Sequence, residues 1–185
     1  DHRDLHSFPT RRSSDLKGKV RKNTFASAGQ NGVFVGKSST VATLTNNKIT
    51  NAGLYGLITS AKSKITTLSN NTISTSNAKN GIVLISNTGT YIKNIKGNTL
   101  TGKYRSGLVV KSPTGKVTIA SNTITSGNAK GVKSMGISVS GCKKGVTITG
   151  NKITGNNTGG GIYVKSSKAS ISKNTVKKST KKIIK

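Results

Sequence analysis

The stretch TIASNTI, residues 118–124, decides the fold because close copies of it recur along the chain. Each copy has an aliphatic residue, an Asn three positions later, one variable residue and then a further apolar residue. The copies are TLTNNKI (43–49), TLSNNTI (67–73), NIKGNTL (94–100), TITGNKI (147–153) and SISKNTV (170–176), with KNTF (22–25) as a partial first copy. Internal repetition at this period is typical of a solenoid, in which each repeat forms one coil.

The aligned Asn residues are 23 to 29 positions apart. We predict that they form a ladder at a bend between strands, where each amide bonds the equivalent amides above and below. Asn also tolerates the left-handed backbone conformation that a sharp bend requires. The ladder residues are Asn23, Asn47, Asn71, Asn98, Asn122, Asn151 and Asn174.

A second signature, Gly followed by aliphatic residues, comes about ten residues after most of these Asn residues. Both signatures alternate with period two and are rich in Val, Ile and Thr, which favours short strands over helices. We expect the Gly to supply conformational freedom at another corner. The copies are GVFV (32–35), GLI (56–58), GIVL (81–84), GLVV (107–110), GISV (136–139) and GIYV (161–164), and Ile183 takes the aliphatic position in the last unit.

The predicted fold class is all-β, a parallel solenoid of about seven coils that pair with one another at ~4.8 Å. Two apolar stripes fill its thin interior. The first consists of Leu44, Leu68, Ile95, Ile119, Ile148 and Ile171, and the second of Phe25, Ile49, Ile73, Leu100, Ile124, Ile153 and Val176.

On these two signatures, Lys17–Lys185 resembles the right-handed parallel β-helix, or pectate-lyase-like, repeat family. The resemblance implies a protein that is secreted or displayed on a bacterial cell surface and that commonly meets polysaccharide. It does not imply one activity, because this architecture carries lyases, hydrolases, epimerases, adhesins and phage spikes.

Residues 1–16 share neither the composition nor the rhythm of the rest. They resemble the conceptual translation of a sequencing-library adapter, so we expect them to lie outside the fold, which then occupies residues 17–185. We also expect the chain to be a fragment, the C-terminal part of a longer protein, so that any signal peptide or further domain would lie upstream.

The charge balance excludes most chemistry. All three acidic residues, both His residues and three Arg residues fall within residues 1–16, so Lys17–Lys185 carries 28 positive charges and no negative one. Glycoside hydrolysis needs two carboxylates, calcium prefers carboxylate oxygen and zinc needs several Cys, His or acidic ligands. We therefore predict no catalytic residue, no metal and no cofactor in this part of the protein.

Two groups are candidates for catalysis. Lys103, Tyr104 and Arg105 resemble the Lys or Arg base and Tyr acid of some lyases of this fold, but a solvated loop is the interpretation that we prefer. Cys142 lies in a turn beside Lys143 and Lys144, which would lower the pKa of its thiol, yet the sequence offers no base. We interpret it as an incidental turn residue.

The excess of Lys predicts a broad, salt-dependent attraction to polyanions, with Lys103, Arg105, Lys111 and Lys165 as contacts. The expected partner is an anionic polysaccharide or cell-wall polymer. Specific nucleic-acid binding is not expected because residues 17–185 have only six aromatic residues and no known motif. No apolar run is long enough for a membrane span, and the oligomeric state is left open.

Ice binding by the pairs Thr99/Thr101 and Thr123/Thr125 is not favoured, because Lys48, Lys152 and Lys177 interrupt their row. The sequence therefore predicts a non-catalytic β-helix module. The alternative is part of a polysaccharide-degrading enzyme whose active site lies in coils upstream. The lack of clear caps also predicts that residues 17–185 aggregate.

Overall fold

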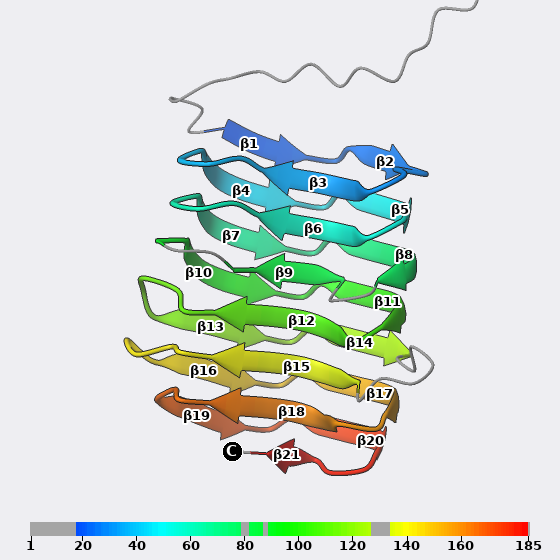
Figure 1. Ribbon diagram of the computed structural model, residues 1–185, viewed down its shortest axis with the longest axis vertical. Helices are drawn as coiled ribbons and strands as arrows, with labels where there is room; N and C mark the ends of the chain where they lie inside the picture. Colours follow the sequence, from blue (N-terminus) through cyan, green and yellow to red (C-terminus); the bar gives the residue numbers. More distant parts are fainter. Residues whose placement is uncertain (1–17, 79–81, 87–88, 127–133, 185) are drawn as a thin grey trace, which may run out of the picture.

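The computed structural model describes residues 18–78, 82–86, 89–126 and 134–184. These residues form 21 strands in three parallel sheets of seven strands each. Successive strands belong to successive sheets, so three strands make one rung and the rungs stack along one axis (Figure 1). The predicted all-β parallel solenoid of about seven coils is confirmed, while residues 1–16 lie outside the described residues.

The three sheets are named A, B and C in the order in which the chain enters them. Sheet A consists of β1 (Gly18–Arg21), β4 (Thr40–Thr45), β7 (Lys64–Ser69), β10 (Tyr91–Lys96), β13 (Val117–Ala120), β16 (Val146–Thr149) and β19 (Ala169–Ser172). Sheet B consists of β2 (Thr24–Ala26), β5 (Lys48–Ala52), β8 (Thr72–Ala78), β11 (Thr99–Tyr104), β14 (Thr123–Ser126), β17 (Lys152–Asn157) and β20 (Thr175–Ser179). Sheet C consists of β3 (Asn31–Val35), β6 (Tyr55–Thr59), β9 (Val83–Ile85), β12 (Ser106–Lys111), β15 (Met135–Ser140), β18 (Gly160–Lys165) and β21 (Ile183–Ile184).

The two predicted apolar stripes lie inside, one on sheet A and one on sheet B. Leu44 pairs with Leu68 and Ile119 pairs with Ile148 on sheet A, and all four are buried. The pairings of sheets A and B keep the stripe residues side by side from rung to rung, so each stripe runs straight through the stack. The members in the first and last rungs remain partly exposed, because a neighbouring rung covers them on one side only.

The Asn ladder occupies the corner between sheets A and B, as predicted. Each ladder Asn from Asn23 to Asn151 donates two hydrogen bonds to the Oδ1 atom of the next ladder residue, one from its backbone N–H and one from Nδ2. For Asn98 and Asn122 both distances are 2.9 Å. The Nδ2 group also donates to a carbonyl of the preceding rung, so that the corner's buried polar groups are satisfied.

The left-handed backbone at this corner falls on the residue before each ladder Asn, and the prediction that the ladder Asn itself adopts it is wrong. In one rung that preceding residue is Asn70, with a φ of 54°, and in the next it is Gly97, with a φ of 64°. The other members of the set are Lys22, Asn46, Ser121, Gly150 and Lys173. The ladder position therefore requires the Asn side chain alone.

The Gly of the second signature is required for space, and the prediction that it supplies conformational freedom is wrong. A Cβ atom on Gly107 would lie 2.5 Å from Ile124 Cγ2 and 2.8 Å from the carbonyl oxygen of Gly136. The glycines at positions 32, 56, 136 and 161 face the same obstruction, and none of these five has a positive φ. In the third rung Ile82 takes this position, because Val83 pairs with Leu57, so the expected alignment of Gly81 is shifted by one residue.

Candidate polyanion interface

The outward faces of the three sheets carry different side chains. On sheet A, Thr43, Thr67, Asn94, Thr118, Thr147 and Ser170 occupy one row in register. On sheet B, Thr72, Thr99 and Thr123 follow one another in one row. The same row continues with Lys48 before them and Lys152 after them. Both faces are therefore polar, and small hydroxyl side chains predominate on them.

Sheet C is different because its outward row is almost entirely apolar. Phe34 begins the row and its side chain is 60% exposed, whereas Val109 in the middle is only 4% exposed. The pairings continue the row without a break through Phe34, Ile58, Leu84, Val109, Ser138, Tyr163 and Ile184. We call these seven residues the outer row. An apolar row on a solvent-facing sheet is a typical mark of an interaction surface.

Sequence reasoning missed the outer row, although a signal for it was present. The third residue of the Gly signature, such as Phe34 in GVFV and Tyr163 in GIYV, points away from the two inward aliphatics that flank it. This position is apolar in most of the repeats.

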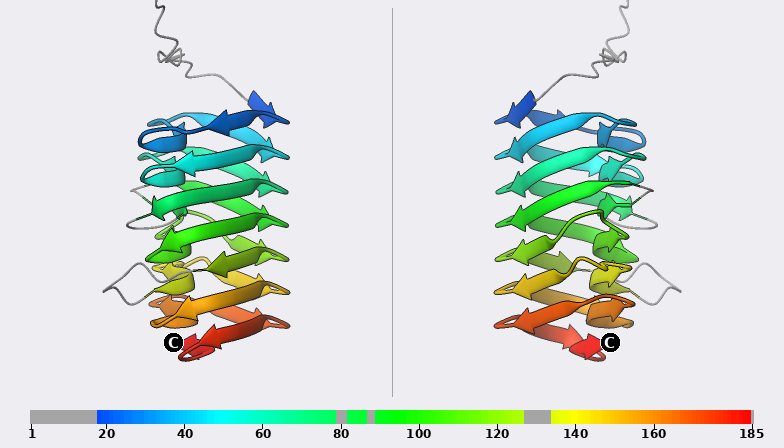
Figure 2. Two further views of the ribbon diagram at one scale, coloured as in Figure 1. Left: turned by 90° about the vertical axis from the view of Figure 1, so that its right-hand side faces the viewer. Right: turned by 90° about the vertical axis from the view of Figure 1, so that its left-hand side faces the viewer.

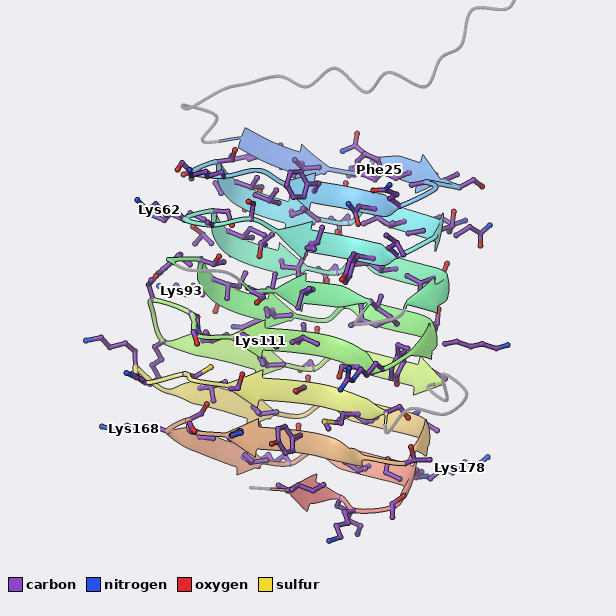
Figure 3. The ribbon with its side chains drawn as sticks, viewed as in Figure 1. Phe25, Lys62, Lys93, Lys111, Lys168 and Lys178 are labelled. Atoms are coloured by element: carbon purple, nitrogen blue, oxygen red, sulfur yellow. The ribbon has the colours of Figure 1, made fainter. Side chains whose placement is uncertain are left out.

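Exposed cations line the two long margins of this face. The C–A margin, where the chain passes from sheet C to sheet A, carries Lys37, Lys62, Lys64, Lys111, Lys116, Lys143, Lys144, Lys165 and Lys168. The B–C margin, where the chain enters sheet C, carries Lys103, Arg105, Lys178, Lys181 and Lys182. Lys62 and Lys168 project from one side of the stack and Lys178 from the other (Figure 3).

The structure divides the four predicted polyanion contacts between these margins. Lys111 and Lys165 end strands β12 and β18 of sheet C, and each pairs with Ser140 between them, so they lie two rungs apart in one row. Two rungs correspond to roughly 10 Å. Lys103 and Arg105 lie at the opposite end of β12, on the B–C margin. The four residues therefore flank one face, and they do not form a single cluster.

Tyr104 differs in exposure from its two neighbours. It lies at the end of strand β11 and is fully buried, while Lys103 and Arg105 on either side are exposed. The interpretation of these three residues as a solvated loop is therefore wrong for the Tyr. Its ring packs in the core near Gly107, 3.4 Å from the place of a Cβ atom on that glycine.

Cys142 is also buried, in the C–A margin, and is a free thiol. Burial raises the pKa of the Cys142 thiol to about 11, while Ser167 lowers it by a smaller amount. The expectation that Lys143 and Lys144 would lower this pKa is therefore wrong. A thiol in this state is a poor nucleophile at neutral pH, because the thiolate is the reactive form.

One aromatic side chain belongs to the C–A margin. The Nζ atom of Lys64 lies 5.2 Å from the centre of the Tyr91 ring, within the range of a cation–π interaction. Gly115 lies against the same ring, because a Cβ atom there would be 2.7 Å from Tyr91 Cε2. The Lys64 ammonium group therefore lies over an aromatic ring at this margin.

Positive charge in this region meets no opposing side chain. The described part of the chain contains neither Asp, Glu nor His, and no group of metal-binding residues occurs in it. It also contains no helix of the length and apolarity that a membrane span requires. The arrangement therefore consists of an apolar row with hydrated ammonium groups along both of its margins, and these groups produce a positive electrostatic potential.

The stacked rungs, the Asn ladder and the parallel pairing agree with a comparison against known families. A model described as "right handed beta helix region" matches residues 10–176, which is most of the chain. The chain belongs to this right-handed β-helix family. No curated protein and no solved structure matches this β-helix in the other two comparisons. The family match starts before Gly18, where the described β-helix begins.

Proposed function

We propose that this β-helix is a non-catalytic module of a secreted or cell-surface protein and that it binds an anionic polysaccharide or cell-wall polymer across the outward face of sheet C. The observation that supports the proposal is the outer row, with cations along both of its margins. The polar faces of sheets A and B have no equivalent of this arrangement.

The apolar outer row suits a chain of sugar rings. The C–H face of a pyranose is apolar, so it packs favourably on aliphatic and aromatic side chains such as Phe34 and Tyr163. The row continues over seven strands, a length of about 29 Å at the usual strand spacing. A polymer lying along the solenoid axis would therefore contact many rungs at once.

The margins suit the anionic groups of such a polymer. Lys predominates over Arg, and the ammonium group is a hydrated point charge that does not impose planar, bidentate geometry. We therefore expect binding that tolerates different anionic polymers and weakens as salt screens the charges. Recognition of one nucleic-acid sequence is not part of the proposal.

The residues of this part of the chain support binding without catalysis. Hydrolysis of a glycosidic bond needs a carboxylic acid and a carboxylate, and residues 17–185 contain neither. The proposal assigns Lys111 and Lys165 to the C–A margin of the binding face, and Lys103 and Arg105 to its B–C margin. No residue is assigned a catalytic role.

Retention on immobilised polygalacturonate over a series of NaCl concentrations tests the proposal. The full chain should be retained at low salt and released as salt rises. The double variant Lys111→Gln/Lys165→Gln should elute at clearly lower salt than the parent protein, because both charges lie on one margin of sheet C. The variant Tyr163→Ser should weaken the retention that persists at higher salt, where apolar contacts contribute most.

The matched control is Lys48→Gln/Lys152→Gln, which removes two exposed charges from the outward face of sheet B. Net charge changes equally in the two double variants. A larger loss of retention for the sheet C pair supports the proposed face. Equal losses would show that net charge alone governs binding, and the assignment to sheet C would then be wrong.

A further inference from the structure

Three neighbouring strands of sheet C, β12, β15 and β18, alternate between charged and uncharged residues on their outward face. Each strand contributes two outward residues near its end, and we call the six together the alternating patch. The pairs are Val109 and Lys111, Ser138 and Ser140, and Tyr163 and Lys165. The β-pairings keep the first members of the pairs side by side, and likewise the second members. Figure 2 shows from both sides that the rungs stack evenly along one axis.

The spacing within the alternating patch follows from the geometry of the sheet. The two members of a pair are two residues apart on one strand, so they lie about 6.6 Å apart on the same face. Successive pairs are about 4.8 Å apart along the solenoid axis. Lys111 and Lys165 therefore occupy positions roughly 10 Å apart, with Ser140 midway between them.

The polar groups of the alternating patch are available to a ligand. Lys111 and Lys165 are exposed, and the described part of the chain has no carboxylate side chain to pair with them. The hydroxyl groups of Ser138 and Ser140 are partly exposed, and neither has a hydrogen-bond partner among the described residues. Tyr163 is also partly exposed and supplies most of the apolar contact surface, because Val109 is only 4% exposed.

We infer that the alternating patch recognises a polysaccharide in which a uronate ring alternates with an uncharged ring, an inference that rests on the proposed function of the sheet C face. A pyranose ring in a polymer that runs along the solenoid axis spans roughly one rung, about 5 Å. Uronate rings over β12 and β18 then place their carboxylates beside Lys111 and Lys165. The uncharged ring over β15 forms hydrogen bonds with Ser138 and Ser140 through its hydroxyl or amide groups.

A polymer with a carboxylate on every ring fits the alternating patch less well. Its middle carboxylate would lie over Ser138 and Ser140, where it loses water and gains no cation from the pair beneath it. Net charge alone favours this polymer, because its higher charge density is attracted more strongly to a chain of net charge +28. A preference for the alternating polymer would therefore have to come from the patch and not from the overall positive potential.

Fluorescence anisotropy of the full chain with end-labelled oligosaccharides of equal length tests this preference at about 0.15 M NaCl, where the Debye length is about 8 Å. Hyaluronate alternates glucuronate with uncharged N-acetylglucosamine, and polyglucuronate carries a carboxylate on every ring. The hyaluronate oligomer should bind several-fold more tightly. Equal affinities, or tighter binding of polyglucuronate, would overturn the inference and leave the proposed function standing. Failure to bind either polymer even at low salt would overturn the proposed function as well.

The variant Ser140→Lys tests whether the uncharged middle pair sets the preference. It adds a cation to β15, so that polyglucuronate meets a cation on each of three successive rungs, and the preference should reverse. Asn94→Lys is the control, since it adds the same charge to the outward face of sheet A and should leave the preference for hyaluronate in place. A preference that Ser140→Lys leaves unchanged would overturn the inference.

The variant Lys111→Gln/Lys165→Gln tests the two charged positions. It should abolish the preference for hyaluronate as well as weaken binding. Its matched control is Lys143→Gln/Lys144→Gln, which removes two exposed charges from the turn after β15, on the same margin. The control should weaken binding of both oligomers by a similar factor and leave the ratio of their affinities unchanged. If the two double variants change this ratio alike, the preference arises from the margin as a whole, and its assignment to the alternating patch is wrong.

Discussion

At the scale of single residues, the ladder Asn side chains stabilise the A–B corner because each amide satisfies buried groups in its own rung and in both neighbours. Asn98 Oδ1 accepts from the backbone N–H and Nδ2 of Asn71, and Asn98 Nδ2 donates to the carbonyl of Leu68 and to Asn122 Oδ1. Both Asn71 and Asn98 are almost fully buried. No other side chain of this size combines an acceptor and a donor in this geometry.

The substitution Asn98→Ala should lower the free energy of unfolding by about 1–3 kcal/mol, because it leaves the buried Asn71 N–H without an acceptor. Urea denaturation followed by circular dichroism measures the change. Asn94→Ala, on the outward face of sheet A, should change stability by less than about 0.5 kcal/mol. Equal effects of the two substitutions would contradict the structural role of the ladder.

At the scale of strands, the close approach of sheet C to sheet B depends on the Gly that begins the second signature. Gly107 in β12 lies against Ile124 of β14, in the next rung, and its backbone contacts Gly136 in β15. The sequence indicated this Gly correctly as a structural position. The reason for it could not be predicted, because contact between adjacent rungs depends on how the coil rises from one strand to the next.

The substitution Gly107→Ala should destabilise the protein by about 1–3 kcal/mol, since the added methyl group would overlap Ile124 and the Gly136 carbonyl. Gly29→Ala is the matched control, because a Cβ atom at Gly29 has no neighbour within 4 Å. Thermal unfolding of both variants measures the difference. A neutral Gly107→Ala would show that the two sheets separate easily at this point.

At the scale of the whole molecule, stability is distributed along a stack in which each rung contacts only its neighbours. The middle rungs have a partner on both sides and a fully buried interior, for example Ile95 in β10 and Ile119 in β13. The end rungs have a partner on one side and partly exposed interiors. The high positive charge makes all rungs repel one another, and salt or a bound polyanion reduces this repulsion.

Hydrogen exchange should therefore be graded along the stack. Backbone amides of β10 and β13 should exchange most slowly, and those of β1, β2, β19 and β20 fastest, because the end rungs open without disrupting the rest. Exchange monitored by mass spectrometry on monomeric protein at low salt measures the gradient. Uniform protection from end to end would indicate a single cooperative unit, contrary to this expectation.

The sequence alone determined the fold, because the same apolar, Asn and Gly positions recur in each repeat and therefore produce the same strands and corners in each rung. It also determined the charge and the lack of carboxylates after residue 16, which limit the chemistry of this part of the chain. Only the tertiary structure decided which strands share a face. It therefore revealed the outer row of sheet C, placed Lys103 and Arg105 opposite Lys111 and Lys165, and buried Tyr104 and Cys142. These features depend on register between residues more than 20 positions apart, and short-range patterns do not contain that register.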